Sequence, residues 1–400
     1  MHMGSAFTWL DHSDRERRKV LEAIDRFKET EARDELGLGP IRDGFADHFF
    51  PGTSVIMTRA RYFFFVPWMY AALERKGAAA DAAAKARRAE LALIEPLGDA
   101  PGNLGKVAGN TLKRLPSSVY WIGLRAWGMR LFGGSQTDYH QLLERGVQVP
   151  KNAARDDDGE LVDGRVVRTW VASLPREPAT FPKEASFDLT RKEAQYLRER
   201  IRFISPQPLL ARLFDSELPD VPYPWLHPAL ATFPDDMRAA LRHAECFAEV
   251  MHGAALLYNH MLAVKGKRDS IDAYRQRIED WRDELAARGS QLAEWKLPEF
   301  WQRARAVANV TDPTMQFVNN WIELRLWEQR DPTGNAAAQA LVAHRERRLK
   351  GGRARLENPR ALELWNGASG TERLVYRWHV AKRLLTDIVQ GLRAKETADA

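Results

Sequence analysis

Three polar residues at helical spacing form the strongest candidate for metal chemistry. Glu245, Glu249 and His252 lie at positions i, i+4 and i+7 and would share one face of a helix. Glu249 and His252 have the Glu-x-x-His spacing of di-iron helical bundles. That chemistry needs a second such pair on another helix, and the sequence contains none. We therefore expect no metal and no cofactor, and we expect His243, His252 and His260 to be helix-surface or satisfied interior histidines.

Motifs for nuclease or nucleotide chemistry are incomplete. His379, Lys382 and Asp387 come within one residue of the spacing found in phospholipase D-type nucleases, but they occur once and lie on an amphipathic segment. A glycine-rich stretch resembles a P-loop, but Ala100 stands at its first glycine position and Val107 replaces the magnesium-binding Ser or Thr. The sequence thus favours a non-catalytic protein. An enzyme whose carboxylates converge only in the fold stays open as the alternative.

Positive charge is concentrated in two stretches of the chain. Residues 341–400 hold 13 basic and 7 acidic residues, which accounts for the whole net charge of +6. Residues 101–137 hold basic residues and no acidic residue. Such zones favour a polyanionic partner, here nucleic acid and foremost DNA; a merely soluble surface is the alternative. The candidate contact residues are Lys106, Lys113, Arg114, Ser118, Trp121, Arg125, Arg345, Arg347, Arg348, Lys350, Arg353 and Arg355.

The first basic stretch has the pattern of a helix-turn-helix at residues 103–132. Helical spacing predicts one helix before a turn at Pro116 and a second helix after it. Ser118, Trp121 and Arg125 fall at i, i+3 and i+7 and would share the face that enters the major groove. The second helix is very apolar, so a buried core helix is the alternative.

The second basic stretch places six cations within residues 345–355, interrupted by Gly351 and Gly352. We expect the cluster to pass from a helix end into a loop. Cations near a helix C-terminus are favoured by the helix dipole, which is one explanation. Contact with phosphates, each adding a salt-dependent increment of affinity, is the other.

Composition places the chain among soluble globular proteins. It has 400 residues, of which 44% are hydrophobic and 28% charged. The longest uncharged apolar run, residues 62–73, contains Pro67 and is shorter than the ~17–25 residues that span a membrane. Cys246 is the sole cysteine, so an internal disulfide is excluded, and no secretory signal is recognisable. We expect a cytoplasmic protein with no membrane partner.

Helical periodicity recurs along the chain and predicts a mainly α protein with two helical lobes. The sequence Thr190 to Glu193 forms a capping box, which marks a helix start. Residues 235–265 read as one long helix, residues 269–288 as the most regular amphipathic helix, and residues 372–393 as the last helix.

A proline-rich segment supplies the predicted domain boundary. Residues 1–145 would form an N-terminal helical domain that includes the helix-turn-helix, and residues 190–400 a C-terminal helical domain with a basic end. Residues 146–189 between them contain Asp163-Gly164 flanked by apolar pairs, a signal for a small β-hairpin.

These segments contain short motifs by which the chain resembles an uncharacterised bacterial family, a domain of unknown function. The motifs extend over nearly the whole chain and comprise Phe7 to Asp11, Phe50 to Ser54, Thr58 to Phe63, Leu115 to Ser118 with Tyr120-Trp121, Gly253-Ala254 with Leu257 to Asn259, and Leu349 to Gly351 with Arg353 to Leu356. The resemblance implies genes beside helicase and phospholipase D-type nuclease genes in phage-defence islands. It carries no activity, so it assigns no catalytic residue.

Charge and resemblance together lead to one expectation and two alternatives. We expect a non-catalytic nucleic-acid-binding or scaffold subunit of a bacterial antiphage defence system. A nuclease-like effector enzyme is one alternative. A protein–protein adaptor for a helicase or nuclease partner is the other.

Overall fold

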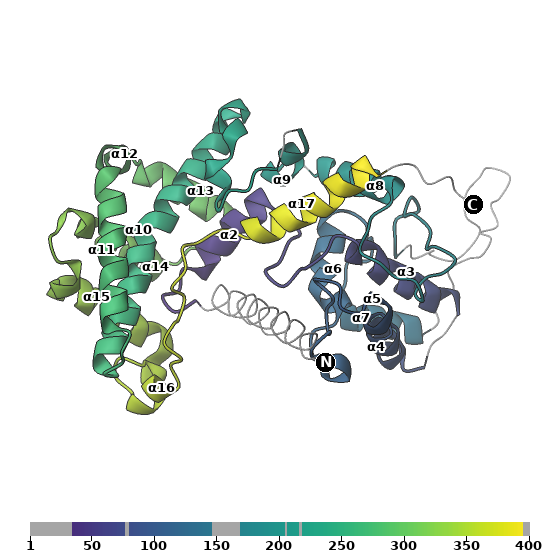
Figure 1. Cartoon of the computed structure of the whole chain (residues 1–400), viewed down its shortest axis with the longest axis horizontal. Helices are drawn as coiled ribbons and strands as arrows, with labels where there is room; N and C mark the ends of the chain where they lie inside the picture. The colour runs from purple at the N-terminus through teal and green to yellow at the C-terminus, as the bar shows by residue number, and fades with distance from the viewer. Residues whose placement is uncertain (1–33, 77–79, 146–168, 205, 216–217, 395–400) are drawn as a thin grey trace, which may run out of the picture. The chain divides into compact units, whose positions relative to one another are not determined.

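The structure is a computed structural model that describes residues 34–76, 80–145, 169–204, 206–215 and 218–394 (Figure 1). These residues confirm a mainly α protein. Within them the sole extended pairing is one antiparallel bridge between Arg130 and Trp170. The predicted β-hairpin at residues 161–167 lies outside the described residues.

Contacts along the chain group it into two units, each made of separate sequence segments. Unit 1 comprises Met1–Ala46, Tyr223–Leu226 and Leu230–Tyr376. Unit 2 comprises Asp47–Pro222, His227–Ala229 and Arg377–Ala400. The helices α2 (Gly39–Phe49) and η4 (Pro228–Thr232) contain residues of both. The contiguous domains delimited at residues 145 and 190 stay a prediction, because much of the segment between them is not described.

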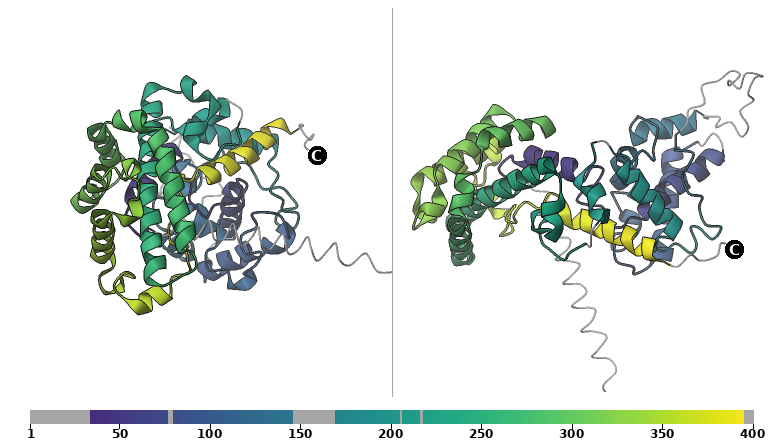
Figure 2. Two further views of the ribbon diagram at one scale, coloured as in Figure 1. Left: turned by 60° about the vertical axis from the view of Figure 1, so that its left-hand side comes forward. Right: turned by 90° about the horizontal axis from the view of Figure 1, so that it is seen from above.

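Unit 1 is built around a single long helix, α10 (Asp235–Lys265), which is buried on most sides. Figures 1 and 2 show α11 (Ile271–Ala287) running beside it. The close approach depends on Gly253: a Cβ there would lie 2.3 Å from the ring of Trp281. The other helices of the unit are η3 (Pro224–Leu226), α12 (Gly289–Ala293), α13 (Leu297–Val307), α14 (Asp312–Glu323), η5 (Leu326–Glu328), η6 (Pro332–Gly334), α15 (Ala336–Lys350), η7 (Gly351–Arg353) and α16 (Pro359–Glu363).

Unit 2 has an aromatic core around α3 (Tyr62–Arg75), whose apolar residues surround the helix and are buried, as expected for a helix apolar on all sides. Phe63 stacks on Trp127 with ring centroids 3.8 Å apart. The other helices of the unit are α4 (Ala82–Leu91), α5 (Ile94–Leu97), η1 (Gly109–Thr111), α6 (Pro116–Ala126), α7 (Gln136–Glu144), α8 (Arg191–Arg202), α9 (Leu209–Arg212), η2 (Leu213–Asp215) and α17 (Trp378–Arg393).

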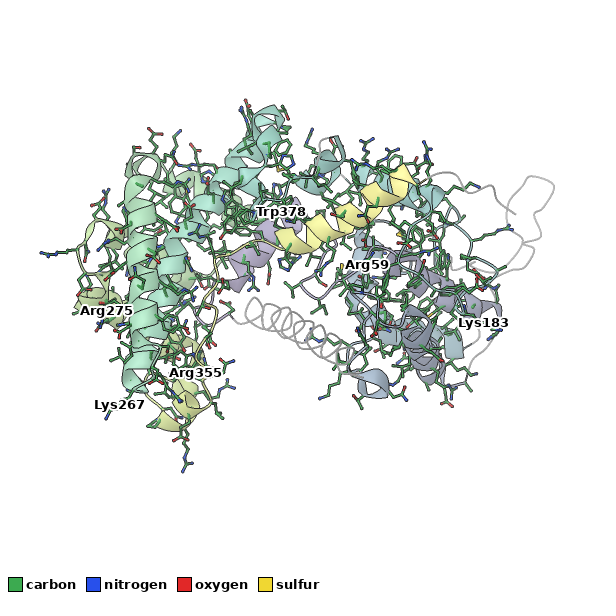
Figure 3. The ribbon with its side chains drawn as sticks, viewed as in Figure 1. Arg59, Lys183, Lys267, Arg275, Arg355 and Trp378 are labelled. Carbon is green, nitrogen blue, oxygen red and sulfur yellow. The ribbon has the colours of Figure 1, made fainter. Side chains whose placement is uncertain are left out.

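The last helix of the chain closes unit 2. Helix α17 packs against α8 (Figure 1). Its Asp387 accepts hydrogen bonds from the backbone N–H of Ala60 at 2.8 Å and from Nε of Arg59 at 3.0 Å. Figure 3 shows Arg59 beside this helix. The start of α3 is thereby tied to a helix more than 300 residues later in the sequence.

The predicted helix-turn-helix is wrong, because its first helix does not form. Residues 103–114 consist of turns and the single 3₁₀ turn η1. Gly102, Gly105 and Gly109 have positive φ angles of 93°, 94° and 49°, which a right-handed helix does not tolerate. The side chain of Asn103 donates instead to the carbonyls of Ile94 and Gly98, which fixes the segment against α5.

Candidate nucleic-acid interface

Helix α6 presents a different face from the predicted one. Ser118 and Arg125 are exposed, and Arg125 donates to the carbonyl of Leu131 at 2.9 Å. Trp121 is a core residue: only 7% of it is exposed, and the guanidinium of Arg130 lies 4.3 Å from its ring centroid. Ile122, 77% exposed, lies between Ser118 and Arg125 instead. The sequence contained this face too, since residues 118, 122 and 125 are also at helical spacing.

The cations that precede α6 differ in their availability. Lys106 forms an ion pair with Asp99 at 2.7 Å. Lys113 and Arg114 are exposed, and no carboxylate of the described residues lies within ion-pair distance of either. Lys113, Arg114 and Arg125 therefore remain as the accessible positive charge in this part of unit 2.

The six cations of residues 345–355, here called the C-terminal cluster, differ in their surroundings. Arg345 is buried and anchors neighbouring segments rather than lying at the surface. It is 4% exposed. Its guanidinium donates to the carbonyl of Leu36 at 2.8 Å and to Oγ1 of Thr314 at 2.9 Å, and it lies over the ring of Phe317. Burial lowers the pKa of Arg345 from its ordinary value. These bonds hold the segment before α2 against α14 and α15.

Lys350 and Arg355 are also committed to internal contacts. Both form ion pairs with Glu35, that of Arg355 at 2.8 Å. Lys350 also contacts the fully buried carboxylate of Glu346 at 3.1 Å, which accepts a further hydrogen bond from the hydroxyl of Tyr258. Burial alone would raise the pKa of Glu35, but the hydrogen bonds and charges of Lys350 and Arg355 hold that pKa below its ordinary value.

The remaining three cations of the cluster lie at the surface. Arg347 is exposed and paired with Glu357 at 2.7 Å. Arg348 and Arg353 are exposed, and neither has a carboxylate within ion-pair distance among the residues described. The structure thus divides the six cations evenly between internal bonds and the surface.

Sequence reasoning missed three further cations at this end of unit 1. Lys265 at the end of α10 donates to the carbonyl of Leu356, so the residues after it lie close to the C-terminal cluster. Figure 3 shows Lys267 and Arg355 at the same end of the unit. We use the name basic end for the exposed residues Lys267, Arg268, Arg347, Arg348, Arg353 and Arg360. The short basic run at residues 265–268 was the signal that could have revealed it.

The segments that carry the basic end contain fewer acidic than basic residues. Asp269, Glu357 and Glu363 are the carboxylates of residues 265–270 and 347–363, against the six cations of the basic end. A positive surface of this kind attracts polyanions through long-range electrostatics, and each phosphate it neutralises releases a bound counterion.

The residues considered for catalysis are engaged elsewhere. Both Glu245 and Glu249 pair with Arg288, the former at 2.9 Å. The guanidinium of Arg288 therefore takes the position that a metal ion would need. Asp387 holds the start of α3, and Lys382 pairs with Asp220 at 2.8 Å. Among the described residues, no group of three or more His, Cys, Asp or Glu side chains is arranged to hold a metal ion.

Cys246 also lacks the features of a reactive thiol. The side chain is buried in α10, and burial raises the pKa of its thiol to about 12. A thiol that stays protonated at neutral pH is a poor nucleophile.

Within the described part of the chain, every helix is too short or too polar to cross a membrane.

Comparison with known proteins identifies a family but no characterised relative. The model of a family described as a family of unknown function (DUF6361) matches residues 4–391. No curated protein matches the chain, and no solved structure matches it.

Proposed function

Because the chain belongs to this family of unknown function, we propose its role from its surface: a non-catalytic nucleic-acid-binding or scaffold subunit that contacts phosphates through the basic end of unit 1. The observation that carries the proposal is the accessibility of Arg348 and Arg353 next to Lys267, Arg268 and Arg360. These cations are exposed, and none of the five has an ion-pair partner among the described residues.

The separation of anchored from accessible cations supports this assignment. A cluster that only complemented the dipole of α15 would need no cations beyond that helix. Here the positive surface continues onto η7, α16 and the residues after α10. Its Arg and Lys side chains have the chemistry that contacts phosphate, and contacts to phosphate carry no information about base sequence. We therefore propose binding that tracks the backbone rather than the bases.

A salt titration tests the proposal. Fluorescence anisotropy with labelled duplex DNA and RNA is measured from low to high salt for the wild-type protein and for Arg348→Glu/Arg353→Glu. We expect the variant to bind much more weakly at low salt. Each lost phosphate contact should reduce the slope of log affinity against log salt by about 0.7–0.9.

The matched control makes the same charge change elsewhere in unit 1. Arg325→Glu/Arg330→Glu alters two exposed cations of the η5 region and should retain the affinity and the salt slope. A wild-type slope in Arg348→Glu/Arg353→Glu would remove the basic end from the proposal. Cleavage of the labelled DNA or RNA in the presence of magnesium would instead favour the nuclease alternative.

An adaptor role is a second candidate that one observation favours. Ile122 on α6 and Val107 are 77% and 84% exposed, and these two apolar side chains are the candidate contact for a protein partner. Pull-down with a helicase or nuclease subunit, wild-type against Ile122→Ser, tests this role. Absence of nucleic-acid binding together with loss of the partner in the variant would favour it.

The proposal includes a biological setting, a bacterial antiphage defence system. Its support is the resemblance of the sequence motifs, which implies a gene in a phage-defence island. Deletion of the gene from such an island, followed by phage plating, tests it. Undiminished protection would rule this setting out.

A further inference from the structure

Unit 1 contains a small cavity that is lined by none of the residues of the basic end. It lies between the segment around Arg42, the middle of α10 and residues 369–374, and its volume is about 60 Å³. Met251, Leu38 and Leu374 supply apolar wall, whereas His252 and Arg373 supply polar groups. A cavity with apolar walls and a few polar groups that converge is the usual form of a small-molecule site.

Two of the polar atoms on the cavity residues are buried without a hydrogen-bond partner. They are Nδ1 of His252 and Nε of Arg373. A third is Oε2 of Glu249, one turn before His252 on α10. Buried polar atoms are nearly always paired in native proteins, so three on neighbouring residues point to a missing partner.

The identity of each unpaired atom fixes what the partner must offer. Nε2 of His252 lies 3.0 Å from the carbonyl of Thr371; because a carbonyl only accepts, Nε2 carries the proton and Nδ1 is an acceptor. Burial, together with the charge of Arg373, lowers the pKa of His252 to about 3, so the ring is neutral at physiological pH. Nε of Arg373 is a donor.

Four of the five charged residues that line the cavity have an ion-pair partner, and the fifth, Asp34, accepts hydrogen bonds from two backbone N–H groups. Arg373 pairs with Glu284 at 2.5 Å, Arg288 holds the other oxygen of Glu249, and Glu35 is held by the two cations described above. A ligand with a net charge would leave that charge uncompensated, which is costly in a partly buried site. An uncharged ligand fits better.

We propose that this cavity binds the polar end of a small uncharged molecule that presents a donor beside an acceptor, namely a carboxamide or the amino edge of a nitrogen heterocycle. The amino N–H donates to Nδ1 of His252, and the adjacent oxygen or ring nitrogen accepts from Nε of Arg373. A cavity of about 150 Å³ encloses a whole benzene ring, so one of about 60 Å³ encloses only this recognition edge.

Two probes test the proposal on the full chain: nicotinamide for the carboxamide and cytosine for the amino edge. Binding is followed by NMR through the long-range ¹⁵N signal of the His252 ring, which is sensitive to a hydrogen bond at Nδ1. We expect at least one probe to saturate and to shift Nδ1 but not Nε2. Toluene, which has no donor or acceptor, should not shift Nδ1.

Two variants and a control locate the binding. Ala255→Leu fills the cavity, and Arg373→Lys keeps the charge but removes the Nε donor. Each substitution should lower the affinity for the probe by tenfold or more. Ala273→Leu, the same enlargement at an exposed position of α11, should bind as the wild-type protein does. If neither probe shifts Nδ1, the cavity holds an ordered water only and the proposal fails. It also fails if Ala255→Leu binds with wild-type affinity.

Discussion

Ser117 donates two hydrogen bonds to the carboxylate of Glu90, from its backbone N–H at 2.6 Å and from its hydroxyl at 2.7 Å. Glu90 belongs to α4 and Ser117 to the first turn of α6, so a carboxylate from another helix caps the N-terminus of α6. Gln136 continues the network, since its amide donates to the hydroxyls of Ser117 and Tyr70.

This pair makes the stability of the protein depend on pH. Burial raises the pKa of Glu90 to about 7, against 4.5 for an unperturbed Glu, although the bonds from Ser117 lower it. The folded state therefore binds more protons than the unfolded state between these values, and stability falls as pH rises from about 4.5 to about 7. We expect Glu90→Gln to remove this loss, which is about 3 kcal/mol.

Urea denaturation of both proteins across this pH range measures the effect. The quantity to follow is the difference in the free energy of unfolding between wild type and Glu90→Gln. His252, whose pKa is lowered by burial, makes stability rise with pH, but it does so in both proteins and cancels in the difference. A difference that stays constant from pH 4.5 to 7.5 would contradict the assignment.

Because Arg345 is buried and Arg348 is exposed, we expect their alanine substitutions to affect different properties of the protein. Arg345→Ala leaves buried carbonyls without a donor and should lower the free energy of unfolding by about 2–4 kcal/mol. Arg348→Ala should change it by less than about 0.5 kcal/mol and should weaken nucleic-acid binding instead. Thermal or chemical unfolding and an anisotropy assay on both variants check this. Equal losses of stability would mean that the two side chains do not differ in role.

Gly253→Ala should destabilise unit 1. The added methyl would lie 2.3 Å from Cζ2 of Trp281, so α10 and α11 must separate, at a cost of about 1–3 kcal/mol despite the better helix propensity of Ala. Gly289→Ala is the control, since no atom lies within 4 Å of the new Cβ. Urea midpoints report both variants. A midpoint for Gly253→Ala at or above that of the wild type would refute the close packing.

The accessible cations of unit 2 predict a separate contribution to binding. Lys113→Ala/Arg114→Ala/Arg125→Ala should weaken duplex DNA binding and reduce its salt slope, with circular dichroism unchanged because the three side chains are exposed. Lys106→Ala, compared with each of the three single substitutions, is the control, since Lys106 is already paired with Asp99. If the triple variant and the control bind alike, unit 2 makes no phosphate contact here.

Elements with local signals could be predicted from the sequence. The capping box at Thr190 forms, with the Thr190 hydroxyl accepting from the N–H of Glu193 and Glu193 accepting from Thr190 in return. The long helix at 235–265 has the predicted bounds. Its apolar residues lie on most sides, and the proline before it marks the start. In both cases the decisive interactions lie within one helix.

Elements that depend on distant contacts could not be predicted. The last helix begins at Trp378 rather than near Glu372, because Tyr376 and Arg377 have positive φ angles. Likewise, the presence of six basic residues among the eleven positions 345–355 does not indicate that Arg345 points inward. Its acceptors, Leu36 and Thr314, lie on other segments of the chain.

The bond between Asp387 and the start of α3 also has a consequence for biosynthesis. The ribosome makes Arg59 and Ala60 more than 300 residues before Asp387. During all the translation between them, the backbone N–H of Ala60 lacks its acceptor and α8 lacks the helix that covers it. The earlier helices of unit 2 therefore emerge as an unfinished fold, and the nascent chain is exposed to aggregation until α17 has left the ribosome.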